Sequence, residues 1–373
     1  MNVRQISTGV CAFLLVLGVS QTTASQAEVP TWNVGDTWSM GVDDIDLTPV
    51  FTTLMENIQG IDYTITGNLG YYIVYEIVAE DIQQYTMSVL EGAEMTMTMS
   101  LSGSYGGQQM FASGNATMVV KMDGTIYYTK DALAITQVDV TINMDVEFSG
   151  TGGDLSGLGA QTVSGSLKLS GNFSATFNPP LDIFDFPISI GDNWTINSTA
   201  TITGSLSGTL SMSGLGEQSL STPLDTTLPI SILATCPNTQ NITLPDGSVS
   251  TAYKIVLSGT GIGGANPLIP ASVIYYSPEQ RFIVAQELSF KDAMNAMTAG
   301  NQETYSTYTL GVASVENDQT LFTMNPMTKD EVTSAMVGLG AEGIDLLLLG
   351  AIMAVIATVI IIAIITVVLV KRR

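Results

Sequence analysis

Histidine is absent from the 373-residue sequence, and cysteine occurs only at Cys11 and Cys236. Without histidine the chain cannot use Ser-His-Asp or Cys-His catalysis, nor any zinc site with imidazole ligands. Cys11 lies in a predicted signal peptide, so the exported chain keeps one thiol and forms no internal disulfide. We expect Cys236 to be a small buried residue rather than a reactive thiol. Paired carboxylates could still hydrolyse glycosides, but no pair stands out by spacing, and we interpret the protein as a non-enzyme.

Basic residues are scarce as well: 11 Lys and Arg stand against 34 Asp and Glu. Arg4 and the three basic residues at the C-terminus lie outside the predicted ectodomain, which leaves seven basic residues there and a net charge of −27. Nucleic acid is excluded as a partner, because its phosphates need a basic surface. The charge is typical of a hydrated surface protein in a salty or divalent-rich medium, and it resembles the acidic bias of archaeal surface proteins.

A single long apolar run lies near the C-terminus. Leu346–Val370 contains 25 uncharged residues, and a helix of that length reaches about 37 Å, enough to cross a hydrocarbon core of about 30 Å. We therefore predict a transmembrane helix over residues 344–370. Asp345 precedes the run and Lys371–Arg373 follow it, so residues 371–373 are predicted to form a cytoplasmic tail.

The N-terminus has the features of a signal peptide. Arg4 precedes the apolar stretch Gly9–Val19, and Ser25-Gln26-Ala27 fits a small-x-small cleavage site. We predict a signal peptide over residues 1–27 and a mature chain that starts near Glu28. Together with the C-terminal helix, this predicts a single-pass protein of the cell membrane with its ectodomain outside.

The ectodomain shows the two-residue periodicity of β-strands. Apolar residues alternate with polar ones over 138–148, 167–177 and 200–212, and Gly-Gly, Asp-Gly and Ser-Gly pairs separate such segments. Before the C-terminal region no long helical period occurs. We predict an all-β ectodomain of antiparallel, curved sheets, either half-barrels or sandwiches.

Two segments recur in the same order. Asn33–Met40 resembles Ser189–Ile196, and Ile126–Asp131 resembles Ile274–Glu279. The recurrence predicts two duplicated domains, over residues 28–180 and 181–320, with the seam at the pair of prolines that follows Asn178. The rings of these segments are either core residues or ligand-binding residues; they are Trp38, Tyr127, Tyr128, Trp194, Tyr275 and Tyr276.

Three further groups of residues are candidates for sites. Asp43, Asp44 and Asp46 could hold Ca²⁺ or form a polar loop, and no other cofactor is indicated. Met95, Met97 and Met99 could bind Cu(I), or they form an apolar stripe on one face of a strand. Five Asn-x-Ser/Thr sequons are candidates for glycosylation, at Asn115, Asn172, Asn193, Asn197 and Asn241.

The ectodomain is predicted to end in a short helix. Thr328 and Glu331 have the spacing of a capping box, and Val332, Ala335 and Met336 follow at helical spacing. We predict a juxtamembrane helix and a glycine hinge over residues 321–343.

A family resemblance bears on function. Asp123–Tyr128 and Ser272–Gln280 resemble the aromatic hairpins of LolA-like lipoprotein-carrier domains. That resemblance implies a strongly curved antiparallel sheet with an apolar concave face for acyl chains. Our leading hypothesis is a membrane-anchored extracellular binding module for a lipid or another apolar ligand. The alternative is a structural or adhesive, glycosylated surface protein whose partners are other surface proteins.

Overall fold

The computed structural model describes residues 26–49, 52, 61–105, 108–154, 161–214, 216–260, 273–289 and 320–338. Most of the predicted signal peptide, the glycine hinge, the transmembrane helix and the tail therefore lie outside the described residues. Within the described part, α4 is the longest helix, and no helix there has the length and apolar character needed to cross a membrane.

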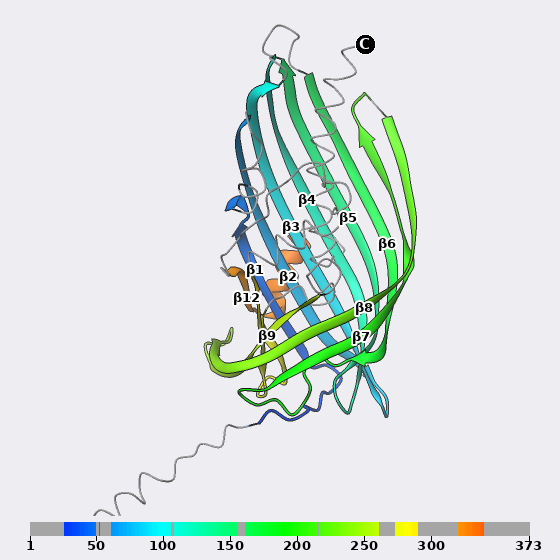
Figure 1. Ribbon diagram of the computed structural model, residues 1–373, viewed down its shortest axis with the longest axis vertical. Coiled ribbons are helices and arrows are strands. Elements are labelled where there is room, and N and C mark those ends of the chain that lie inside the picture. Colours follow the sequence, from blue (N-terminus) through cyan, green and yellow to red (C-terminus); the bar gives the residue numbers. More distant parts are fainter. Residues whose placement is uncertain are drawn as a thin grey trace, which may run out of the picture.

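The described chain forms one closed antiparallel barrel of twelve strands, in the order β1-β12-β11-β10-β9-β8-β7-β6-β5-β4-β3-β2 (Figure 1). The all-β, antiparallel prediction is confirmed. The elements are β1 (Thr37–Asp46), β2 (Ile61–Glu80), β3 (Gln84–Tyr105), β4 (Gln108–Thr129), β5 (Ile135–Asp154), β6 (Gln161–Leu181), β7 (Asn193–Met212), β8 (Gly216–Thr243), β9 (Val249–Thr260), β10 (Val273–Ser277), β11 (Phe282–Ser289), β12 (Thr320–Pro326) and α4 (Lys329–Gly338).

The strands differ greatly in length. β2 to β8 have 20–28 residues each, whereas β1 and β9 to β12 have 5–12. A strand of 20 residues spans about 66 Å and one of 8 residues about 26 Å. Among the described residues, the ring of strands is therefore complete only at the end where β1 and β9 to β12 lie, which we call the closed end. Beyond it, β2 to β8 project as a curved wall that we call the trough (Figure 1).

The long edge of the trough is suited to remain unpaired. Among the described residues, β8 pairs with β9 from Ser231 onward, and its stretch 216–230 pairs with β7 alone. Pro223 and Pro229 lie in that stretch. Proline has no N–H to give to a further strand, so it is typical of sheet edges and discourages edge-to-edge pairing.

The expectation of two separate domains is corrected by the barrel. The recurring segments open β1 and β7, which are six strands apart, and they end β4 and β10. Each turn has a glycine at positive φ, 96° at Gly35 and 95° at Gly191. In each, an aspartate accepts a hydrogen bond from the N–H three residues earlier, at 2.8 Å for Asp36 and 2.6 Å for Asp192.

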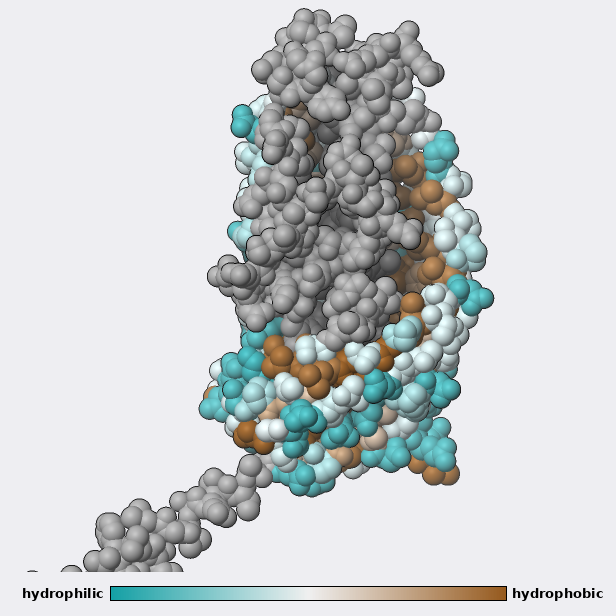
Figure 2. Space-filling view, in the orientation of Figure 1, coloured by the Kyte–Doolittle hydropathy of each residue, from teal (hydrophilic) through white to brown (hydrophobic). Residues whose placement is uncertain are grey.

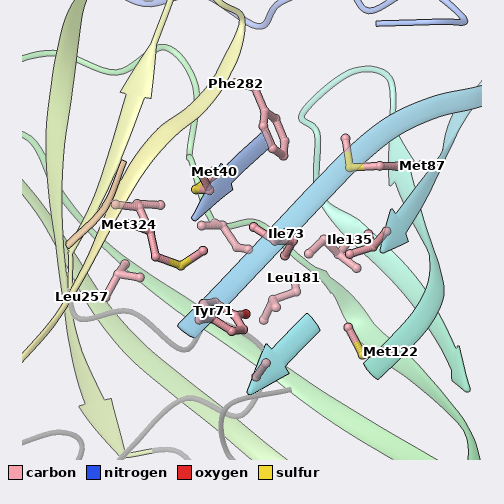
Figure 3. Close-up of a cluster of buried hydrophobic side chains, with 14 of the residues drawn as sticks. Met40, Tyr71, Ile73, Met87, Met122, Ile135, Leu181, Leu257, Phe282 and Met324 are labelled. Atoms are coloured by element: carbon pink, nitrogen blue, oxygen red, sulfur yellow. The ribbon is translucent and has the colours of Figure 1, made fainter. Parts of the chain in front are cut away.

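The two halves share one core, which is why they do not separate. The main cluster of buried side chains draws on β1 to β12 without interruption at the predicted seam. Figure 3 shows Met40, Met87, Met122 and Met324 from four different strands gathered in this interior. Each half has an apolar inner face that it can bury only against the other half.

Aromatic rings fill the closed end. Trp32 lies 5.1–5.7 Å from the rings of four neighbours, which are Trp38, Tyr85, Tyr128 and Phe282. The indole N–H of Trp32 donates to the carbonyl of Arg281 at 2.8 Å. Ala27, the last residue of the predicted signal peptide, also belongs to the fold here, because it pairs with Ile188 and is buried. The closed end is thus packed solidly.

The predicted capping box and helix are confirmed in α4. Glu331 accepts hydrogen bonds from the N–H and hydroxyl of Thr328 at 2.8 and 2.7 Å, and the N–H of Glu331 donates back at 3.2 Å. Val332 and Met336 pack against Tyr72 on the outer face of β2. Residues 320–326, most of which we expected in the helical segment, form β12 instead, because they complete the ring between β11 and β1.

Replacing Trp32 with Ala should destabilise the barrel. Trp32 is 1% exposed, and removing such a buried ring costs about 3–5 kcal/mol. The matched control is Ile82→Ala, since Ile82 is 95% exposed and its loss should change the free energy of unfolding by less than about 0.5 kcal/mol. Urea unfolding followed by circular dichroism measures both, and equal stability of the two variants would contradict a packed closed end.

Candidate functional site

The inner face of the trough carries apolar side chains that are only half-buried. They come from three adjacent strands, and we call them the inner stripe: Leu169, Phe173, Ile202, Leu206, Leu210 and Leu228. Apolar residues along β7 fall at even positions, and the odd positions between them are polar and, apart from the half-buried Thr209, exposed. Figure 2 shows hydrophobic residues gathered over the same strands, beside the atoms drawn in grey. A concave apolar surface of this kind is typical of a site for an apolar ligand.

Glycines shape the wall beneath the stripe. Gly204 and Gly208 on β7 lie opposite Phe173 and Leu169 of β6. A Cβ at Gly208 would meet the carbonyl oxygen of Lys168 at 2.1 Å, so no larger residue fits. The missing side chains let Phe173 and Leu169 lie against the neighbouring backbone, which keeps the concave face smooth.

Methionines cover the adjoining part of the inner face. Met95 on β3 lies directly opposite Met118 on β4, and Met144 on β5 is buried nearby. Met95 and Met97 are buried and Met99 is half-buried, all within or against the main apolar core. Methionine adapts its shape easily, so this region can pack against ligands of different outline.

One polar pair lies inside the apolar interior. The hydroxyl of Tyr71 donates to Oε1 of Glu91 at 2.5 Å, and Glu91 is 4% exposed. Glu91 lies between Val89 and Ala93 on the inner face of β3, and the residues beside it on that face are apolar. Since β1 last pairs with β2 at Asn68, just beyond Tyr71, this pair lies where the closed end passes into the trough.

The six aromatic residues predicted as candidates lie away from the inner stripe. Trp38, Tyr128, Trp194 and Tyr276 point into the core of the closed end, where burial raises the pKa of Tyr128 and Tyr276. The Tyr276 hydroxyl has no hydrogen-bond partner among the described residues. Tyr127 is half-buried on the other face of β4.

Tyr275 lies in a small separate cluster of apolar residues and donates to Glu287 at 2.6 Å. A role of the six rings in ligand binding stays a prediction.

The three aspartates proposed for Ca²⁺ lie on β1 around a bulge. Asp43 accepts a hydrogen bond from Tyr72, and Asp44 adopts a positive φ of 51°. Hydrogen bonds from the side chain and backbone of Thr48 lower the pKa of Asp46. In the described part of the chain no three acidic or cysteine side chains come together as a metal site.

The sequon asparagines all lie on exposed positions. Asn115, Asn172 and Asn197 are on the outer face of long strands, and Asn193 and Asn241 are near the closed end. A glycan on any of them would project away from the inner face.

Five of the six residues of the inner stripe have a signal in the sequence, because they belong to the alternating segments 167–177 and 200–212 that predicted strands; Leu228 lies outside those segments. What the sequence does not indicate is which alternating face stays partly open. The sequence patterns did not indicate Tyr71 or Glu91 as site residues. Glu91 could have been found because it is a carboxylate at a position where the alternation of the strand calls for an apolar residue.

Comparison with protein-family models, with curated proteins and with solved structures finds no match to this chain.

Cys236 provides a test of the packed closed end. It is buried, as expected, and burial raises the pKa of its thiol to about 11. At pH 8 only about one thiol in a thousand is then ionised. With Cys11 replaced by Ser, a disulfide reagent should modify Cys236 slowly in the folded protein and quickly in urea. Fast modification of the folded protein would show that the closed end admits solvent.

Proposed function

We propose that this protein is an exported, membrane-anchored binding protein, and that the inner stripe of its trough holds an elongated apolar ligand such as a lipid chain. The observation that carries the proposal is the set of half-buried apolar side chains on the concave face of β6 to β8. Water contact with such a surface is unfavourable by about 25 cal/mol per Å², so covering it with an apolar ligand releases free energy.

The dimensions of the trough support a chain-like ligand. The stretch 216–230 of β8, which pairs with β7 alone among the described residues, is about 50 Å long at about 3.3 Å per residue. This length exceeds the thickness of the hydrocarbon core of a bilayer, about 30 Å, so the trough is long enough to hold a lipid chain. The resemblance of Asp123–Tyr128 to LolA-like carrier domains points to the same ligand class.

The chemistry of the interior supports binding rather than catalysis. The chain has no histidine, and the buried carboxyl of Glu91 is engaged by the hydroxyl of Tyr71. Attachment to the membrane rests on the apolar run Leu346–Val370, and export rests on the N-terminal apolar stretch.

Leu206→Glu should weaken binding of fluorophore-labelled palmitic acid to the purified, delipidated full chain. Burying a leucine against an apolar ligand contributes about 1.5–3 kcal/mol, so the affinity should fall by roughly tenfold to a hundredfold. The matched control is Ser205→Glu, because Ser205 is the next residue of β7 and lies exposed on the opposite face. Equal binding by both variants would contradict a site on the inner stripe, and absent binding by the unmodified protein would contradict an acyl ligand.

A structural or adhesive surface role is the second candidate, favoured by the five exposed sequons. If they are used, glycans cover the outer wall and leave the inner stripe free.

Replacing each sequon asparagine with Gln should lower the mass of the protein by one glycan when it is expressed in a host that glycosylates asparagine. Intact-protein mass spectrometry before and after enzymatic deglycosylation measures this. Unchanged masses for all five variants would contradict a glycan coat, and the adhesive hypothesis would lose its main support.

A further inference from the structure

The path of the chain after the barrel indicates which end of the trough faces the membrane. Lys329, the first residue of α4, forms an ion pair with Glu76 of β2 at 2.6 Å, and Met336, seven residues later, belongs to an apolar cluster with Tyr72 and Val74 of the same strand. The helix rises about 10 Å over those seven residues, and β2 covers about 7 Å from Glu76 to Val74 and about 13 Å from Glu76 to Tyr72. The helix rise falls between the two strand distances, so α4 runs along the outer wall.

The direction of that run is set by β2. The turn after Glu80 lies at the closed end, and Ile61 lies at the open end of the trough. A helix that begins beside Glu76 and continues beside Val74 and Tyr72 therefore points its C-terminus toward the open end. Figure 1 shows α4, in orange, against the lower and middle part of the long wall.

The remaining chain is short. Eight residue steps separate Gly338 from Leu346, where the uncharged run begins, and they reach at most about 29 Å. From Tyr72 the wall of β2 continues for eleven residues to Ile61, about 36 Å along the strand. The membrane span can therefore begin no farther from the closed end than about the level of the open rim.

The distribution of charge agrees independently. Met95–Val120 and Asn193–Gly216, which pass around two of the three hairpins between the described long strands at the open end, contain no Asp, Glu, Lys or Arg. The acidic residues at the open ends of the long strands are Asp62, Asp154 and Glu217. By contrast, the segments that turn the chain at the closed end all contain acidic residues: Asp81, Asp131, Asp182, Asp185, Asp192, Asp246 and Glu279. A rim with few charges can approach lipid headgroups at little electrostatic cost, whereas anionic headgroups repel the more acidic closed end.

We infer that the trough opens toward the membrane that anchors the protein, and that its ligand is the apolar chain of a bilayer lipid drawn from the adjacent leaflet. This inference rests on the proposed function for the identity of the ligand, but the orientation stands on the path of α4 and on the charges. The inner stripe then forms a continuation of the hydrocarbon region, and a lipid chain can enter it without crossing open water.

Energy transfer in vesicles tests the orientation. The full chain, with Cys11 and Cys236 replaced by Ala, is reconstituted into phosphatidylcholine vesicles that contain an acceptor dye on a lipid headgroup. A donor dye is placed on Thr162→Cys near the open rim or on Gln83→Cys at the closed end, both of which are exposed positions. β6 runs from the open rim to the closed end over about 69 Å along the strand, so the two labels report clearly different heights.

We expect higher transfer efficiency from Thr162→Cys than from Gln83→Cys. Equal efficiencies, a reversed order, or a chain that does not float with the vesicles would overturn the inference. A long Gly-Ser spacer inserted after Gly340 changes none of the described residues and should reduce the difference between the labels. Val332→Asp, which introduces a charge into the contact between α4 and β2, should do the same, with the barrel checked by circular dichroism.

The outcomes separate the inference from the function on which it rests. If the rim label lies near the membrane but labelled palmitic acid does not bind, the acyl ligand is wrong and the orientation holds. If palmitic acid binds and the closed end lies near the membrane, the ligand class holds and the inference falls.

Discussion

Backbone hydrogen bonding between strands of unequal length determines where the interior of this protein is closed. A strand can be covered only as far as its neighbour extends, and in the part of the chain that the structure describes, β1 and β9 to β12 reach a fraction of the way along β2 to β8. Where the ring is complete, aromatic and methionine side chains pack into a solid core. Where it is not, the same alternation of side chains presents a concave apolar face that the described residues only half bury.

The local features of this fold could be predicted from the sequence because each depends on neighbouring residues. Alternation of apolar and polar residues over 167–177 and 200–212 predicted strands, and the structure has β6 and β7 there. The capping box at Thr328 predicted α4 for the same reason. Strand number and closure depend on contacts between residues far apart in the chain. The recurrence of Asn33–Met40 at Ser189–Ile196 therefore suggested two domains, when it marks equivalent turns in two halves of one barrel.

The same distinction between local patterns and contacts over long sequence distances applies to the candidate site. Sequence patterns drew attention to the tryptophans and tyrosines of the recurring segments, because large rings are frequent in binding sites. In the structure, Trp38, Tyr128 and Tyr276 fill the closed end, where their neighbours are other rings and the loops that close it. The inner stripe consists of ordinary leucine, isoleucine and phenylalanine residues. Only the unequal coverage of the strands distinguishes them from core, and that coverage is not local information.

The most direct measurement of lipid-chain binding in the trough is photo-cross-linking in the membranes of cells that produce the full chain. Phe173 on the inner stripe, or Ser174 beside it on the outer face, is replaced with p-benzoylphenylalanine and irradiated. Lipid-chain binding in the trough predicts a lipid-sized mass adduct on the chain carrying the reagent at position 173 and none at position 174. Equal adducts at both positions, or cross-links to protein alone from position 173, would contradict it.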